Sequence, residues 1–279
     1  MQSPVMLVKG HLHAFREIVA LLNRHKFLAW EMAKREITDR YRGQLLGTFW
    51  AVMHPLTLIM VYVFIFVVVF KIKLGGNRDM PLDYTAYLLA GLIPWLGCQE
   101  VLAKASTAIT GSVNLVKQVV FPIEILPIKG VISSIINQII LLVLLGIYVL
   151  ISHHSLPWTY CFIPLLLIVQ TLGMMGTAFM LSAVGVYFRD VKDVMQVFIV
   201  IGVYLLPVFY LPAQVPSAFK PILYINPFSY LIWCYQDALY FGRFEHPYAW
   251  AILILLSHII LVSGYRLFRR LKIMFGSVL

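Results

Sequence analysis

Two carboxylates, Asp190 and Asp193, are the residues best placed for metal-dependent chemistry. Three positions apart on a helix, they would lie on one face, where two carboxylates can share a Mg²⁺ ion in an enzyme. Arg189 and Lys192 flank them, however, and a helix dipole stabilises acidic residues at its start. Because the sequence offers no second acidic cluster, no catalytic and no metal-binding residue is predicted.

A phosphate-binding loop is missing from the sequence. None of its 17 glycines is followed by lysine, a step that the P-loop pattern requires. The chain therefore does not bind ATP in that way, and no cofactor is predicted. If ATP drives its activity, another polypeptide must hydrolyse it.

The composition is that of a protein that crosses a membrane several times. Hydrophobic residues make up 61% of the chain, charged residues 12%, and the mean hydropathy is +0.87. A soluble domain is typically about 25% charged, and a run of about 20 apolar residues crosses the hydrocarbon core. We predict an all-α, polytopic membrane protein with one domain and six spans, at residues 49–70, 84–103, 131–151, 160–188, 194–211 and 248–265.

The basic residues indicate how the spans are oriented. Most of the 22 Lys and Arg residues lie before the first span or after the second, fourth and sixth. Loops rich in Lys and Arg stay in the cytoplasm, so both termini are predicted to be cytoplasmic. The formal charge of +10 is thus assigned to the membrane surface, not to a nucleic-acid partner. The three cysteines, an odd and scattered set, indicate neither a disulfide framework nor a metal cluster.

One acidic residue and two histidines lie inside the apolar stretches. Glu100 is near the cytoplasmic end of the second span, where ionisation costs less than at the bilayer centre. His54 lies about one turn inside the first span, and His258 lies midway along the sixth. We interpret both as neutral, hydrogen-bonding histidines, with a proton relay as the alternative.

The segment 24–41 is predicted to be an amphipathic helix. Apolar residues, Trp30 among them, recur near one face, and charged residues, Arg35 among them, occupy much of the rest. Such a helix can lie among the lipid headgroups or dock a cytoplasmic partner. The sequence does not choose between these two roles.

Two further segments are interrupted by proline. Residues 112–120 predict a short cytoplasmic helix with an apolar face, and the alternative is an ordinary connecting loop. Residues 212–241 alternate prolines with aromatic residues, in pieces too short to cross a bilayer. Backbone at membrane depth must satisfy its own hydrogen bonds, so two short re-entrant helices are predicted there. Their aromatic residues suit an interfacial belt or, alternatively, an external gate or sugar-contacting rim.

An aromatic stripe follows the outer half of the first span. Tyr62, Phe66 and Phe70 are spaced at i, i+4 and i+8 and so share one helix face. Aromatic rings offer rigid, amphipathic surfaces without deep polar traps. The stripe is predicted to line a pathway, and packing against other helices or lipid is the alternative.

Five motifs in order resemble one family, the Wzm-like membrane permeases of polysaccharide-exporting ABC transporters. They cover nearly the whole chain: RYRGQLLGTFWAVMHPL (residues 40–56), GLIPW (91–95), NLVKQVVFPIEILP (114–127), YFRDVKDV (187–194) and YINPFSYL (224–231). Gln118 and His54 depart from the family pattern, in which a second basic residue and a neutral residue are usual.

The resemblance implies a homodimer in the bacterial inner membrane that pairs with two copies of a separate ATPase. The expected cargo is a lipid-linked glycan of the O-antigen type, linked to undecaprenyl diphosphate. Capsule, teichoic acid and lipid or drug exporters of the same superfamily are alternatives, as is a membrane enzyme that acts on lipid-linked sugars.

The resemblance also implies roles for individual segments. Residues 24–41 become the interface helix, with Trp30 and Arg35, and 112–120 the coupling helix, with Asn114, Leu115, Val116, Lys117 and Gln118. Residues 212–241 become the periplasmic gate, with Tyr224, Tyr230 and Trp233. The first and fifth spans are expected to flank the dimer axis, which adds Tyr204 to the channel-lining residues Tyr62, Phe66 and Phe70.

Overall fold

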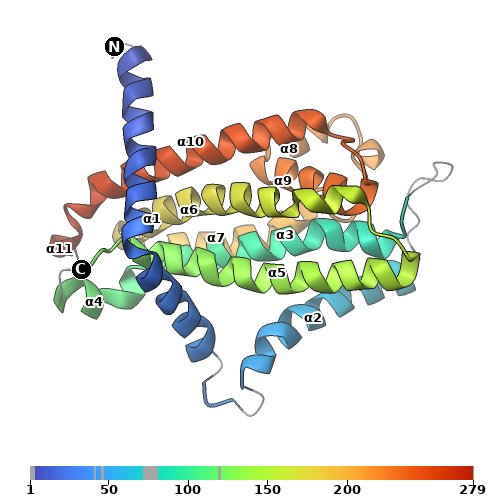
Figure 1. The fold of residues 1–279 in the computed structure, drawn as a ribbon, viewed down its shortest axis with the longest axis horizontal. Coiled ribbons are helices and arrows are strands. Elements are labelled where there is room, and N and C mark those ends of the chain that lie inside the picture. Colours follow the sequence, from blue (N-terminus) through green and yellow to red (C-terminus); the bar gives the residue numbers. More distant parts are fainter. Residues whose placement is uncertain (1–3, 41, 45–46, 72–80, 119–120, 279) are drawn as a thin grey trace.

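The structure is a computed structural model that describes residues 4–40, 42–44, 47–71, 81–118 and 121–278 (Figure 1). These ranges fold into helices and turns without a strand. The long helices are α1 (Pro4–Arg40), α2 (Trp50–Val63), α3 (Tyr84–Ala105), α5 (Ile125–His153), α6 (Ile163–Tyr187) and α10 (Pro247–Lys272). The short ones are α4 (Val113–Gln118), α7 (Val191–Gly202), α8 (Lys220–Ile225), α9 (Pro227–Gln236) and α11 (Phe275–Val278). The predicted all-α membrane fold is confirmed.

Short 3-10 and π-helical turns join or extend these helices. Two of them are π-helical: η2 (Phe64–Val69), which continues α2, and η7 (Asp237–Phe241), which continues α9. The 3-10 turns are η1 (Gly47–Phe49), η3 (Thr110–Ser112), η4 (Trp158–Phe162), η5 (Val203–Leu205) and η6 (Pro212–Gln214).

Five segments of the described chain are long and apolar enough to cross a membrane. They are Val52–Val69, Tyr84–Ala105, Ile125–His153, Trp158–Tyr187 and Pro247–Lys272. The fifth predicted span, 194–211, begins on α7, but that helix ends at Gly202 and the backbone is extended at Leu206. Pro207 explains the change, because a residue that precedes proline is driven out of the helical region. The count of six spans stays a prediction.

One end of the bundle gathers several segments that lie outside the spans. Helices α3, α5, α6 and α10 run along the long axis, and α1 crosses them at the end where α4 and the C-terminus also lie (Figure 1). We call this the α4 end. Helix α1 is longer than the predicted 24–41 and has a kink at His25, and Tyr41 lies outside the described residues.

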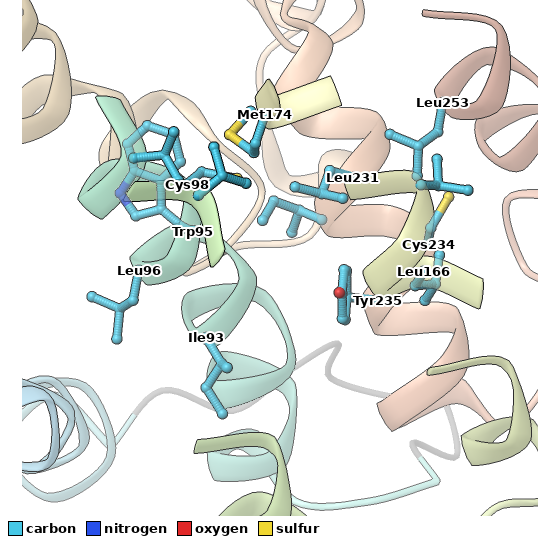
Figure 2. Packing of buried hydrophobic residues seen from close by; sticks show 14 of the residues in the cluster. Ile93, Trp95, Leu96, Cys98, Leu166, Met174, Leu231, Cys234, Tyr235 and Leu253 are labelled. Carbon is cyan, nitrogen blue, oxygen red and sulfur yellow. The ribbon is translucent and has the colours of Figure 1, made fainter. Parts of the chain in front are cut away.

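Burial distinguishes a central helix from a peripheral one. In the apolar part of α3, 83% of the residues are buried, whereas in that of α2 only 6% are buried. Trp95 and Cys98 of α3 lie in one core with Tyr235 of α9 and Leu166 of α6 (Figure 2). Helix α3 is therefore the centre of the bundle, and α2 lies at its periphery, where Leu58, Met60 and Val61 are exposed.

Glycine residues permit a close approach between α6 and α10, the two helices with the most extensive contact in the described structure. A Cβ atom on Gly176 would lie 2.4 Å from the carbonyl carbon and oxygen of Ile260, and one on Gly264 would lie 2.1 Å from the carbonyl oxygen of Gly176. The two backbones therefore meet directly, as small residues allow between membrane helices.

This contact predicts a difference between two glycine substitutions. Gly176→Ala should lower stability by about 1–3 kcal/mol, because the helices must move apart to admit the methyl group. Gly146→Ala on α5 is the control, since its Cβ would lie 3.8 Å from the nearest side-chain atom, of Tyr160. Thermal unfolding in detergent measures both, and equal midpoints would contradict the close contact.

Candidate functional site

Helix α4 presents most of its described side chains outward. Asn114, Leu115 and Lys117 are exposed, with Leu115 at 42%, whereas Val116 packs against the core. The side chain of Gln118 lies outside the described residues. An exposed leucine beside polar residues suits a docking surface, and the coupling role of these residues stays a prediction.

Helix α1 buries one face and exposes the other. Ala29 and Ala33 are buried, whereas Trp30 is 50% exposed. The Arg35 guanidinium is also exposed and pairs with Asp39 of the same helix at 3.1 Å. The small buried residues let α1 lie close against the bundle, so Trp30 and Arg35 remain available to headgroups or to a partner.

An ion-pair network connects α1 with the spans. Glu36 of α1 lies 2.8 Å from the Lys104 ammonium of α3 and 3.6 Å from that of Lys129 of α5. The Ser133 hydroxyl donates a hydrogen bond to Glu36 at 3.1 Å, and Lys104 also pairs with Glu100 at 2.9 Å. Burial acts to raise the pKa of Glu36, but the two lysines and Ser133 hold that pKa below its usual value. Glu36 therefore stays ionised and joins three helices.

Two further ion pairs tie α10 to this end. The Lys272 ammonium lies 2.7 Å from Glu124, just before α5, and Arg269 pairs with Glu17 of α1. Movement of α1 would thus act on α3, α5 and α10 together.

The aromatic stripe forms a cluster with two residues that follow α7. Phe66 stacks on Phe209 with ring centroids 4.5 Å apart, and Phe209 lies 5.7 Å from Tyr204. Along α2 and η2, Tyr62 lies 6.3 Å from Phe66, which lies 5.9 Å from Phe70. We call these five residues the aromatic cluster.

Exposure divides the aromatic cluster into two parts. Phe209 is buried, Tyr62 and Phe66 are partly buried, and Phe70 and Tyr204 are 63% and 56% exposed. Part of the stripe therefore packs within the chain, and the other part faces outward. Sequence reasoning missed Phe209 as the partner because an irregular segment has no helical periodicity.

The non-helical segment after α7 is held by side-chain donors. Inside a bilayer, a carbonyl without a helical partner must find one in the protein. The Gln236 amide of α9 donates a hydrogen bond to the Pro207 carbonyl at 2.7 Å. From α3, the Tyr84 hydroxyl donates to the Phe209 carbonyl at 2.9 Å, and the Tyr87 hydroxyl donates to the Tyr210 carbonyl at 3.0 Å. These hydrogen bonds fix where the aromatic cluster lies.

The predicted gate residues lie together. The ring centroids of Tyr224 and Tyr230 are 5.4 Å and 5.5 Å from that of Trp233, and the Tyr230 hydroxyl donates to the Tyr224 carbonyl at 2.6 Å. Trp233 is fully buried and stacks on His246 at 5.4 Å. The buried Trp233 ring thus packs against both tyrosine rings, and the gating role of these residues stays a prediction.

A buried carboxylate, missed by sequence reasoning, anchors this segment. Asp237 is fully buried, accepts hydrogen bonds from the His246 backbone at 3.0 Å and from Trp250 Nε1 at 3.1 Å, and lies 2.9 Å from His246 Nδ1. A lone acidic residue within an apolar, aromatic stretch was the available signal. Asp237 joins the end of the gate segment to the start of α10.

A second missed group is a polar network in the core. The Gln138 and Gln170 amides bond each other at 2.8 Å, and the Tyr235 hydroxyl donates to Gln170 at 2.7 Å. Gln170 also reaches the Cys98 sulfur at 3.4 Å. These contacts join α3, α5, α6 and α9. Glutamines inside apolar spans were visible in the sequence, but their partners were not.

The acidic pair considered for metal chemistry lies at the start of α7. Asp190 is the N-cap and Asp193 lies in the first turn, and both are exposed. At the N-terminal end of a helix, both carboxylates are stabilised by the helix dipole. Within the part of the chain that the structure describes, no three His, Cys, Asp or Glu side chains form a group suited to a metal ion.

Comparison with known proteins adds relatives of similar length. The O-antigen export system permease protein RfbA of Klebsiella pneumoniae is 26% identical over 250 residues, which cover 89% of this chain and 93% of the relative. A protein of the same name from Myxococcus xanthus is 26% identical over 228 residues, or 81% of this chain and 85% of the relative. Residues 28–240, which include α4, the aromatic cluster and most of the gate segment, match the ABC-2 type transporter family. The chain therefore belongs to the ABC-2 type transporter family.

Proposed function

We propose that this chain is the membrane subunit of an ATP-driven exporter that moves a lipid-linked polysaccharide of the O-antigen type out of the cytoplasm. The observation that carries the proposal is the similarity to O-antigen export permeases along nearly the full length of both chains. The complex comprises two copies of this chain and two copies of a separate ATPase. It lies in the bacterial inner membrane with both termini in the cytoplasm.

The α4 end supports the docking of an ATPase. Helices α1 and α4 expose Trp30, Arg35 and Leu115 there, and the sequence has no P-loop of its own. Force on α1 would reach three spans through Glu36 and Glu17. Helix α2, which packs loosely on its own bundle, is free to contact a second copy or lipid.

Deletion of the gene tests the proposed function. Cells that lack this chain should lose surface glycan and accumulate lipid-linked polymer inside, and the native chain should restore export. The purified chain alone should hydrolyse no ATP, because hydrolysis requires the partner. Unchanged surface glycan after deletion would contradict the proposal. Loss of capsule, teichoic acid or a lipid instead would identify another cargo.

Docking of the ATPase is tested on α4 with two variants of equal charge change. Leu115→Asp should weaken partner binding at least about 100-fold, because burying an unpaired carboxylate costs several kcal/mol. Asn114→Asp is the matched control, since that side chain is already polar and exposed. Co-purification of the ATPase measures both, and equal recovery would remove Leu115 from the interface. Val116 is unsuited to this test because it packs inside the chain.

The role of the aromatic cluster in export is tested on its exposed members. Tyr204→Ala combined with Phe70→Ala should slow export by about two- to tenfold, because the glycan loses aromatic surface along its path. Dimer assembly and partner ATPase activity should remain, since both side chains are more than half exposed. Pulse-labelling of surface glycan gives the rate. Normal export would contradict a channel role, and failed assembly would show that the two rings pack instead.

A further inference from the structure

A pocket of about 490 Å³ lies at the end of the bundle away from the α4 end, where α3 and α10 both begin (Figure 1). Its volume falls within the range of about 300–1,000 Å³ that is usual for small-molecule sites. We call it the outer pocket. The start of α3, the gate segment and the turn before α10 form its lining, which includes Ala213, Phe241, Arg243, Glu245 and His246.

Two buried residues make the inner wall of the outer pocket rigid. Tyr87 and Gln236 line the pocket and are almost completely buried. The Gln236 amide donates a hydrogen bond to the Pro207 carbonyl, and the Tyr87 hydroxyl donates to the Pro207 and Tyr210 carbonyls at 3.3 Å and 3.0 Å. The wall is therefore formed before any ligand binds, as is usual for small-molecule sites.

His246 offers a ligand one ring nitrogen in a fixed position. Its Nδ1 lies 2.9 Å from the Asp237 carboxylate, which also accepts hydrogen bonds from the His246 backbone and from Trp250. A carboxylate only accepts hydrogen bonds, so Nδ1 carries the hydrogen and Nε2 of the neutral ring is an acceptor. Nε2 has no partner among the described residues, and unlike the partnerless indole nitrogen of Trp233 it is not sealed from solvent. Stacking on Trp233 fixes the plane of the ring.

Arg243 and Glu245 place a donor and an acceptor side by side at the outer pocket. The Arg243 guanidinium lies 2.9 Å from the Glu245 carboxylate, and both side chains are exposed. Gly242 precedes them with a φ of +64°, a conformation that glycine adopts readily and that turns the chain after η7. Hydroxyl groups both donate and accept hydrogen bonds. Of two adjacent hydroxyls on a ligand, one can therefore accept from the guanidinium while the other donates to the carboxylate.

The charges of the outer pocket favour a neutral ligand. Arg243 is paired with Glu245, and no other Lys or Arg is among the lining residues of the pocket. A phosphate would therefore meet no uncompensated cation. In the described part of the chain, no three potential metal ligands come together either. Phe241 adds an aromatic ring, which suits the C–H face of a ligand. A neutral molecule with adjacent hydroxyls and C–H faces, such as a sugar, meets these requirements.

We propose that the outer pocket binds one sugar unit of the glycan as it leaves the transport pathway. Arg243 and Glu245 hold adjacent hydroxyls, and His246 Nε2 accepts a hydrogen bond from a further hydroxyl. This inference rests on the proposed function and adds a contact on the exit side to it. Because two of the three polar groups remain exposed to water, the contact is weak enough for the polymer to move on. A phospholipid headgroup of the outer leaflet is the competing occupant.

Photo-cross-linking identifies the occupant. Benzoylphenylalanine replaces Ala213, which lines the outer pocket, or Ala218, an exposed alanine of the same segment that does not line it. After illumination of cells that make the glycan, the permease is purified and probed with an antibody against the polymer. Adducts should be at least fivefold stronger at Ala213 than at Ala218 and absent from a strain that makes no glycan. Equal or absent polymer adducts at Ala213 would overturn the proposal. So would a phospholipid adduct there, detected by mass spectrometry in the strain without glycan.

Two charge-neutralising variants test the polar contacts. Arg243→Gln should reduce the polymer adduct at Ala213 at least threefold, because a sugar hydroxyl loses its donor. Lys220→Gln is the matched control, since it removes one positive charge from the same outer segment but lies outside the pocket lining. Equal adducts in the two variants would overturn the assignment of Arg243. Should Arg243→Gln fail to assemble, the comparison of Ala213 with Ala218 in the otherwise native chain decides.

Two results distinguish this inference from the proposed function. If the native chain fails to support glycan export, the proposed function itself is wrong. If the native chain exports glycan but Ala213 forms no polymer adduct, only the assignment of the outer pocket is wrong.

Discussion

Backbone carbonyls within a bilayer have no water to bind, and the irregular segment after α7 depends on how that need is met. Pro207 ends the helical path after α7, and donors from α3 and α9 satisfy the carbonyls that follow. The same hydrogen bonds place Phe209 against Phe66 and leave Tyr204 exposed. The irregular segment thus positions two of the five residues of the aromatic cluster, Tyr204 and Phe209.

At the α4 end, ion pairs between helices compensate charged side chains. There Glu36, Lys104 and Lys129 pair across helices α1, α3 and α5, and Lys104 also pairs with Glu100 of α3. Breaking such a pair leaves an uncompensated charge, so α1 and the spans tend to move as one unit. If an ATPase docks on α1 as proposed, this arrangement connects it mechanically to α3 and α5.

Sequence patterns predicted those features that depend on local periodicity and composition. The apolar runs predicted membrane helices at residues 84–103 and 248–265 close to those observed, α3 and α10. The motif order indicated a polysaccharide-exporter permease of the ABC transporter class, and the match to the ABC-2 type transporter family agrees with it. The prediction was less accurate for residues 194–211, where the apolar run continues but Pro207 changes the backbone.

The sequence by itself determined that the chain lies in a membrane, that its fold is all-α and which family it resembles. Hydrophobicity and motif order are properties of the linear chain, so they can be read without the tertiary structure. Only the tertiary structure decided which polar groups meet. Asn137 and Glu100 are 37 positions apart, and Tyr84 and Phe209 are 125 apart. Local periodicity holds no information about such pairs, because their proximity depends on how α3, α5 and the segment after α7 pack together.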